Sequence, residues 1–207
     1  MITRQSGFTV IELMIAVALV AVLATIAAPS LRDTLKNARM VGTANDFMAD
    51  LSVARGEAVK RALPTAMCTS NNGTTCTNSG WKDGWIIFTD NNPSDGILNG
   101  ADVLIKSARA IDGASDTVPN TITASRVGGG AIPTATGEYV SFRPSGVVAI
   151  GGGGEYQFLI CDSRFGTDAT SQYKGRILYL SGTGRAYARR CTCTAINQTA
   201  NPPDCAP

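Results

Sequence analysis

The most constraining feature of this 207-residue chain is an apolar run near its start that contains one carboxylate. The run extends over residues 8–28 and is interrupted only by two threonines and Glu12. A helix of about 20 apolar residues is long enough to cross the hydrocarbon core of a membrane, which is ~30 Å thick. The run therefore predicts a transmembrane helix. An ionised acid inside such a helix costs about 2.5–3.5 kcal/mol, so we expect Glu12 to have a partner or a function.

Two ordinary explanations account for this run less well. A secretory signal peptide has an apolar region of about 7–15 residues, which is shorter than this run and does not contain an acid. Its basic start would consist of Arg4 alone, and Pro29 directly follows the small residues where cleavage would occur. The second explanation is a plain membrane anchor in which Glu12 is incidental. Neither explains the glycine and phenylalanine at Gly7 and Phe8.

Segment 7–13, GFTVIEL in one-letter code, resembles the processing site of type IV prepilins and of type II secretion pseudopilins. The resemblance implies that a prepilin peptidase and N-methyltransferase cuts after Gly7 and methylates the new N-terminus, Phe8. It also implies that Glu12 becomes the fifth residue of the mature chain and pairs with the N-terminal amine of a neighbouring subunit. Such a pair would neutralise a carboxylate that is otherwise stranded in lipid.

We therefore expect residues 1–7 to be a leader and residues 8–28 to form a helix that spans the inner membrane and later lies in the filament core. Pro29 follows at the membrane exit, and a proline inside a helix removes a backbone donor and predicts a kink. Beyond it, apolar residues recur at spacings of three and four, which predicts an amphipathic helix over 29–63. Pro64 disfavours helical geometry in the preceding residue and ends this helix.

After Pro64 the chain changes to short runs rich in β-branched and aromatic residues, separated by turn residues. This pattern predicts a mainly antiparallel β-sheet head over 64–207, whose about 140 residues suit one domain. With the helix, it gives an α+β fold. The glycine clusters at 128–130 and 151–154 lack the lysine and hydroxyl residue that follow a phosphate-binding loop, so we expect ordinary loops. We expect strands at 65–69, 85–89, 103–109, 121–126, 139–142, 147–150, 156–161, 176–181 and 185–191.

The head extends the resemblance and narrows it to the FimT/GspH branch of minor pilins and pseudopilins. The resemblance implies the pilin fold, in which a long N-terminal helix packs on an antiparallel sheet. It also implies a minor pilin that helps to initiate or tip a type IV pilus together with other minor and major pilins. The alternative is a pseudopilin of a type II secretion system. Residues 193–207 match no pattern of this branch. The segments that carry the resemblance are 54–61, Cys68, 84–90, 142–146, Cys161 and 180–185.

All six cysteines lie in the part of the chain that this topology puts outside the cytoplasm, which favours disulfides. Sequence alone leaves their connectivity open. Structural zinc is less favoured, because the chain has neither histidine nor a CxxC pair. Within the branch, the cysteines favour the pilus over the secretion system. Closeness along the chain and between predicted strands gives the expected pairs Cys68–Cys76, Cys161–Cys191 and Cys193–Cys205.

Other chemistry has little support in the sequence. A chain without histidine lacks the commonest general base, so we expect no enzyme activity and no cofactor. The oxygen-rich loop 90–96 does not have the ligand spacing of an EF-type calcium loop and is better explained as a turn. On the helix, the groupings of Asp50 with Arg55 and of Glu57 with Lys60 are interpreted as a solvated charged face.

Nucleic-acid binding by the head is a further hypothesis, with non-specific DNA as the candidate partner. Some FimT-like pilins are taken to bind DNA through a Gly-Arg-x-Arg motif, but here Tyr187 stands where the second arginine would be. Arg185, Tyr187 and Arg189 alternate along one predicted strand and would share a face, so two charges would flank a ring suited to base stacking. The alternative is an exposed strand made soluble by arginines, which is the more usual meaning of such a charge run. The candidate residues are Lys174, Arg176, Arg185, Tyr187, Arg189 and Arg190.

The first prediction concerns processing. In the native host, the mature protein should begin at Phe8 and carry an N-methyl group, because Gly7 supplies the small residue at the bond that is cut. Intact-mass analysis measures this directly. The variant Gly7→Asp should retain residues 1–7. An N-terminus at Met1 or Pro29 in the unmutated protein would contradict the prediction, as would removal of the leader from the variant.

Overall fold

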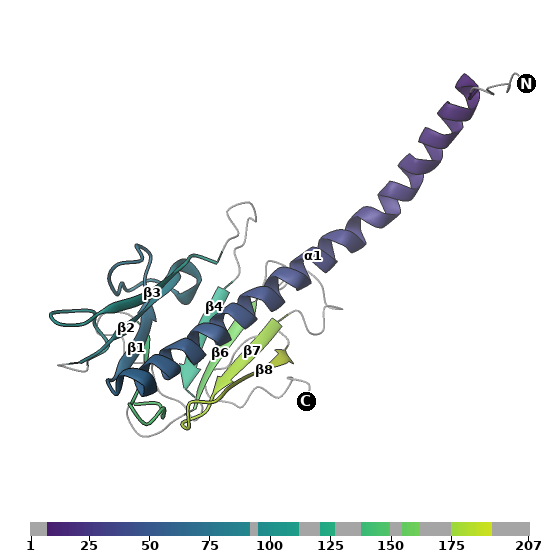
Figure 1. Ribbon diagram of the computed structural model, residues 1–207. Helices are drawn as coiled ribbons and strands as arrows, with labels where there is room; N and C mark the ends of the chain where they lie inside the picture. The colour runs from purple at the N-terminus through teal and green to yellow at the C-terminus, as the bar shows by residue number, and fades with distance from the viewer. Residues whose placement is uncertain are drawn as a thin grey trace, which may run out of the picture. The chain divides into compact units, whose positions relative to one another are not determined.

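The computed structural model describes the chain in segments separated by gaps (Figure 1). The chain divides into two compact units, Met1–Arg39 and Met40–Pro207, and each is described here by itself. The described residues are 8–91, 95–111, 121–126, 138–149, 155–161 and 175–191. Side chains are not described at residues 26–30, 32, 33, 121–126 and 191.

Helix α1, Val10–Arg61, is 52 residues long and remains helical through Pro29. The kink expected at Pro29 stays a prediction. The predicted leader 1–7 lies outside the described residues, as do the last side chains of the predicted span 8–28. Among the helices of the described segments, none combines the length and the apolar character that crossing a membrane requires.

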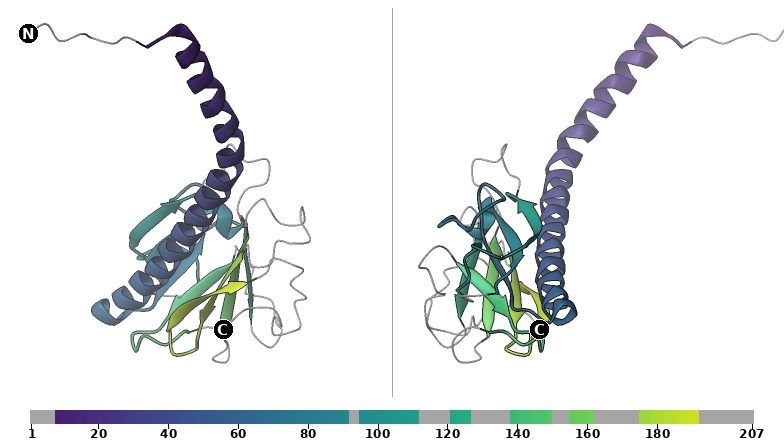
Figure 2. Two further views of the ribbon diagram at one scale, coloured as in Figure 1. Left: turned by 90° about the vertical axis from the view of Figure 1, so that its right-hand side faces the viewer. Right: turned by 60° about the vertical axis from the view of Figure 1, so that its left-hand side comes forward.

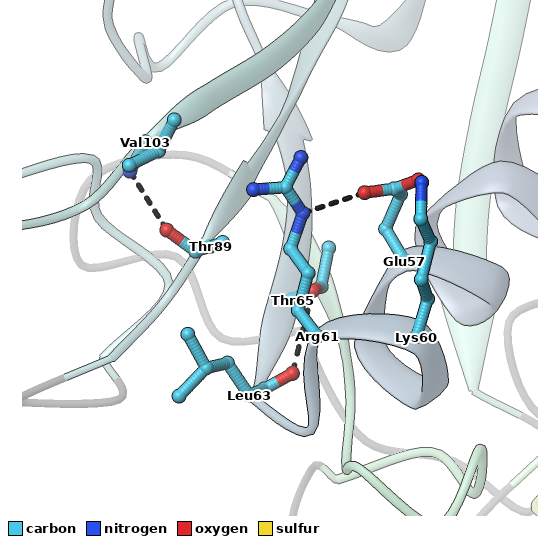
Figure 3. Close-up of polar contacts among 7 residues, drawn as sticks. All are labelled: Glu57, Lys60, Arg61, Leu63, Thr65, Thr89 and Val103. Carbon is cyan, nitrogen blue, oxygen red and sulfur yellow. Dashed lines mark hydrogen bonds and ion pairs between the residues drawn. The ribbon is translucent and has the colours of Figure 1, made fainter.

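The end of α1 is stabilised by charged side chains (Figure 3). Arg61 Nε donates to Glu57 Oε2 at 2.6 Å, and Lys60 Nζ lies 3.4 Å from Glu57 Oε1. The hydrogen bond from Arg61 lowers the pKa of the Glu57 carboxyl. Both cations also suit the negative end of the helix dipole. Ala62 then adopts a φ of 54°, which ends the helical repeat, and Pro64 follows as the sequence predicts.

The head contains two four-stranded sheets in which all strand pairs are antiparallel. The first has the order β3-β2-β1-β5 and the second the order β4-β6-β7-β8. A short 3-10 helix, Trp81–Asp83, precedes β2. The strands are β1 Thr65–Thr69, β2 Gly84–Thr89, β3 Leu104–Arg109, β4 Thr121–Arg126, β5 Tyr139–Phe142, β6 Tyr156–Cys161, β7 Gly175–Leu180 and β8 Ala186–Cys191 (Figure 1).

Every predicted strand forms within one residue of its predicted bounds except 147–150. The prediction of a strand there is wrong for its described part, where Val148 makes a single bridge to Phe142. The reason is a tight turn just before it, closed by the Arg143 N–H bond to the Val147 carbonyl at 2.8 Å. The Val148 N–H then donates to Gly182 O at 3.0 Å, in the turn between β7 and β8. This segment therefore links the two sheets instead of extending one.

The core lies between the two sheets and the part of α1 from Met40 onward. Figure 2 shows the helix beside the strands. The predicted apolar face of the helix is confirmed from Met40 onward, where every third or fourth side chain is buried. Alanines at the later positions allow a close approach of the helix to the strands. The buried helix residues are Met40, Ala44, Phe47, Leu51, Ala54 and Ala58.

Phe47 joins α1 to both sheets through an aromatic cluster. Its ring centroid lies 5.0 Å from that of Trp85 in β2 and 4.8 Å from that of Phe158 in β6. Trp81 completes the cluster, at 5.4 Å from Phe47 and 5.6 Å from Phe158. Most of these rings meet edge to face, the arrangement that aromatic pairs favour. One helix side chain thus connects two sheets that share no strand.

The second prediction follows from this cluster. Phe47→Ala should lower the free energy of unfolding by about 3–5 kcal/mol, because the ring is fully buried and its loss leaves a cavity. Urea unfolding of the purified protein, followed by tryptophan fluorescence, measures this change. The signal is local, since the chain has only two tryptophans and both contact Phe47.

Val53→Ala on the same helix is the matched control, because Val53 is 38% exposed. Its loss should change stability by less than about 1 kcal/mol. Equal effects of the two substitutions would show that Phe47 does not hold the sheets together.

Candidate functional site

The first candidate site is the N-terminal motif, of which the structure describes residues from Phe8 onward. Gly7, the predicted cleavage residue, lies outside this description. Phe8 is 89% exposed and lies two residues before the start of the helix at Val10. Glu12 lies in the first turn of α1, where the partial positive charge of the helix end favours an acid. The carboxylate therefore suits its position electrostatically even without a second subunit.

Thr9 and Glu12 form a reciprocal capping box at the start of α1. The Glu12 N–H donates to Thr9 Oγ1 at 3.3 Å, and the Thr9 N–H donates to Glu12 Oε2 at 3.3 Å. The Thr9 hydroxyl also lies 3.3 Å from Glu12 Oε2. Two backbone donors that the helix leaves unpaired are thereby satisfied. In the single chain, the Glu12 carboxylate is bound to its own helix start.

The sequence analysis missed this role of Thr9. The signal was present, because a threonine followed three residues later by a glutamate, before an apolar run, is the pattern of a capping box. The family resemblance pointed to a partner subunit for Glu12, whereas this pattern indicates a contact within its own chain.

Arg55 holds two glycine turns together in the head. Its Nε donates to Gly146 O at 2.9 Å, in the turn after β5. Gly146 and Gly184 both have a φ of 78°, which favours glycine. A Cβ on Gly184 would lie 2.2 Å from Gly146 O and 2.9 Å from Arg55 Nε, so the turn between β7 and β8 also packs here. Three segments that carry the family resemblance therefore meet at one point.

Asp50 is a buried polar group of the helix, and its interpretation as part of a solvated face is wrong. The residue is 2% exposed, and its Oδ2 accepts a hydrogen bond of 2.8 Å from Trp85 Nε1. Its Oδ1 accepts from Lys106 Nζ in β3. A buried carboxylate requires such partners, and these two bind the helix to the first sheet. Arg55, its predicted neighbour on that face, is instead bound to Gly146.

The oxygen-rich loop beginning at Asp90 uses its carboxylates within the chain. Asp90 accepts from the N–H groups of Asp95 and Gly96 at 3.1 and 3.2 Å. Asp102 accepts from the N–H of Asn91 at 2.8 Å. Among the described residues, no group of acids, cysteines or histidines has an arrangement suited to a metal ion. These contacts are those of a turn closed by its own side chains.

The basic residues of the last strands divide between two faces of the second sheet. Tyr187 and Arg189 alternate with Ala186 and Ala188, and these alanines pack against the core. Arg190 is in phase with the alanines and therefore lies on the opposite face from Arg189.

Arg176 in β7 is the register partner of Arg190, so these two arginines share a face. Arg185 directly precedes β8 and is exposed. Lys174 lies outside the described residues. The structure thus keeps Tyr187 with Arg189 and separates both from Arg176 and Arg190.

The Tyr187 ring is already in contact with protein on more than one side. It stacks on Tyr179 of β7 with 5.1 Å between centroids and an interplanar angle of 18°. The Arg189 guanidinium carbon lies 5.6 Å from the centroid of the same ring. Burial, together with the neighbouring Tyr187, raises the pKa of Tyr179. A nucleic-acid base could use the Tyr187 ring as a stacking platform only by displacing one of these groups.

Of the expected disulfides, Cys68–Cys76 is confirmed, with an S–S distance of 2.05 Å. Cys161 is also disulfide bonded, and its partner is one of the cysteines whose side chains the structure does not describe. The register sets Cys161 opposite Gly175, and Gly175 opposite Cys191. Two strand spacings are about 9.6 Å, whereas a disulfide joins Cα atoms about 4.4–6.8 Å apart. The register therefore argues against the expected Cys161–Cys191 pair. The expected Cys193–Cys205 pair lies outside the described residues.

Comparisons with known proteins give two family models. The model of the type II transport protein GspH matches residues 43–184, and the model of the prokaryotic N-terminal methylation motif matches residues 2–28. No curated protein sequence gives a significant match.

The solved structures similar to the chain include a minor pilin and a minor pseudopilin. The type IV minor pilin FimU of Pseudomonas aeruginosa has 20% identity and a TM-score of 0.44, over 72% of this chain and 86% of that chain. The minor pseudopilin EpsH from the type 2 secretion system of Vibrio cholerae has 9% identity and a TM-score of 0.42, over 73% of this chain and 97% of that chain.

The third prediction concerns the point where the glycine turns meet. Gly184→Ala should destabilise the protein by more than about 2 kcal/mol, because it adds a backbone clash to the cost of a left-handed alanine. Gly100→Ala is the matched control, since Gly100 also has a positive φ of 48° but has no atom within 4 Å of an added Cβ. The control should cost about 1–2 kcal/mol. Urea unfolding of both variants measures the difference, and equal values would show that the packing at Gly184 is not tight.

Proposed function

The chain belongs to the family of the type II transport protein GspH, whose model matches residues 43–184, and from this premise we propose that it is a minor pilin that helps to initiate or tip a type IV pilus. Membership of this family makes the protein a minor pilin or a pseudopilin. The alternative to our proposal is a pseudopilin of a type II secretion system.

The N-terminal motif carries the proposal. The methylation motif covers residues 2–28, which include Gly7, Phe8 and Glu12. A prepilin peptidase would cut after Gly7, and the segment from Phe8 would hold the subunit in the inner membrane with the head in the periplasm. The same segment would then enter the filament beside other pilins. The protein acts as a building block in this scheme, so we propose no catalytic role.

Glu12 would change partners during assembly. In the single chain, its carboxylate accepts hydrogen bonds from the backbone and hydroxyl of Thr9. After cleavage, each subunit also carries a positive amine on Phe8. A neighbouring amine is a stronger partner than a neutral hydroxyl, because both charges gain most from pairing in a low-dielectric environment. The capping box would therefore hold the carboxylate until a neighbouring subunit supplies that amine.

The disulfides support the pilus over the secretion system. Cys68–Cys76 ties the end of β1 to the loop that follows it, and Cys161 at the end of β6 is bonded as well. Covalent ties of this kind stabilise a small head that would be exposed outside the cell. Nucleic-acid binding by β8 stays a separate prediction, and the experiment on β8 described below tests it.

Deletion of the gene in the native host separates the two systems. A minor pilin is required for surface pili, so sheared pilus preparations should lose the major subunit and regain it when the gene is restored. A pseudopilin is required for secretion, so its loss should leave enzymes in the periplasm. Normal piliation together with a secretion defect would refute our proposal in favour of the alternative.

The fourth prediction concerns Glu12. The variant Glu12→Ala should insert into the membrane at least as well as the unmutated protein, because it removes a charge from the apolar run. It should be strongly depleted from sheared filaments, because the amine of the neighbouring subunit loses its partner. Quantitative immunoblots of membrane and filament fractions measure both.

Thr9→Ala is the matched control, because it removes the side chain of the capping box and leaves the carboxylate. A lost cap alone costs about 1 kcal/mol, so this variant should enter filaments better than Glu12→Ala. Equal depletion of the two variants would mean that Glu12 acts only as a helix cap. Incorporation of Glu12→Ala at the unmutated level would refute any role in assembly.

A further inference from the structure

Strand β8 forms one edge of the second sheet (Figure 1). It pairs with β7 over its whole length, from Ala186 opposite Leu180 to Cys191 opposite Gly175. Within the described segments, no strand pairs with its other side. Alternate residues of an antiparallel strand direct their main-chain N–H and C=O groups away from the paired neighbour. This side of β8 therefore offers hydrogen-bond donors and acceptors to an added strand.

The edge is strongly basic, and the described strands β7 and β8 contain no acidic residue. Arg189 and Arg190 lie on β8 with their side chains on opposite faces, and Arg185 precedes the strand; all three are exposed. The ion pairs formed among the described residues involve Glu57, Asp83 and Asp50, and none of them reaches β8. A chain segment running along this edge would meet positive charge on both faces of the sheet.

The Arg176–Arg190 pair adds to this charge. The two residues lie directly opposite each other in the register of β7 and β8, and like charges in such positions repel. Burial, together with the charge of Arg190, lowers the pKa of Arg176. A carboxylate from an added segment would relieve this repulsion, because it would bring an opposite charge to both guanidinium groups.

The other edges of the two sheets are less suited to a partner. At the edge strand β3, Lys106 is bound to Asp50, and the pairing with β2 shifts between Ile87 and Phe88. Such a bulge protects an edge from added strands. The edge strand β5 has only four residues. Among the edges whose side chains are described, β8 thus combines length with free charge.

Charge also determines which occupant fits. A second copy of the chain would bring its own arginines against Arg189 and Arg190, so self-pairing is disfavoured. A phosphodiester backbone accepts hydrogen bonds but offers no N–H groups to the carbonyls of the edge. The Tyr187 ring, which a base would need, is already occupied by Tyr179 and Arg189. An extended acidic peptide satisfies both the charges and the main-chain groups.

We propose that the outer edge of β8, with which no described strand pairs, binds an extended acidic segment of another protein, which adds to the second sheet as a further strand. The arginines favour an acidic partner and disfavour a second copy of the chain. The main chain of β8 supplies the hydrogen bonds. The residues of this binding site, on β8, are separate from the assembly motif around Glu12.

The test uses the full chain purified in detergent and a fluorescent peptide of about seven residues, in which glutamate and threonine alternate. This length matches a typical strand. Fluorescence anisotropy at low ionic strength measures binding, and the same peptide with lysine in place of glutamate is the charge control. The acidic peptide should bind, and the basic peptide should not. Absence of binding by the acidic peptide would overturn the proposal.

Two variants locate the site. The double variant Arg189→Glu with Arg190→Glu should weaken binding by at least about ten-fold, because it reverses charge on both faces of the edge. Arg109→Glu is the matched control, since Arg109 is exposed at the end of another edge strand, β3. This control should bind as the unmutated chain does. Equal weakening by both variants would mean that overall charge, and not β8, attracts the peptide.

Two further ligands test the mode of binding. An acidic peptide with alternate backbone nitrogens methylated keeps its charge but loses the N–H donors on one edge. Strand addition predicts at least about ten-fold weaker binding of this peptide, and unchanged binding would overturn the proposal. A single-stranded oligonucleotide of similar length should bind less tightly than the acidic peptide. Tighter binding of the oligonucleotide, lost in the double variant, would assign β8 to nucleic acid instead.

Discussion

The head depends on the contacts of one phenylalanine. The two sheets share no strand, so they need an element that touches both, and Phe47 of α1 lies against Trp85 in one sheet and Phe158 in the other. Asp50, one turn later, fixes the helix to the first sheet through Trp85 and Lys106. The packing of Phe47 stabilises the contact between the helix and the two sheets. The hydrogen bonds of the buried Asp50 carboxylate fix the orientation of the helix on the first sheet.

Local patterns predicted the elements of this fold well. The strands 65–69, 121–126, 139–142 and 156–161 form at their predicted bounds, because runs of β-branched and aromatic residues between turn residues are a short-range signal. The family resemblance is confirmed, and the bond between Cys68 and Cys76 follows from their closeness in sequence. In each case the residues that determine the structure are near one another in the chain.

The features that sequence could not predict are those fixed by distant partners. Asp50 is buried because Trp85 and Lys106, far along the chain, satisfy its carboxylate. The described part of segment 147–150 does not form the predicted strand, because a tight turn precedes it and Val148 bonds to Gly182, in the turn between β7 and β8. Arg189 and Arg190 lie on opposite faces of β8, because successive side chains of a strand alternate between faces. The basic residues that are close in sequence therefore do not form one patch. Only the arrangement of the sheets determines these contacts.

The polar contacts of α1 with the head also bear on mechanical strength. Asp50 and Arg55 attach the helix at successive turns, to β2 and β3 in one case and to the turn after β5 in the other. A force along the helix axis would act on these polar contacts and on the Phe47 cluster at the same time, as shear. The contacts would therefore not break one after another. Shear-loaded contacts share tension, so rupture requires several to fail together. A head attached in this way resists a pull along the helix better than one attached at a single contact.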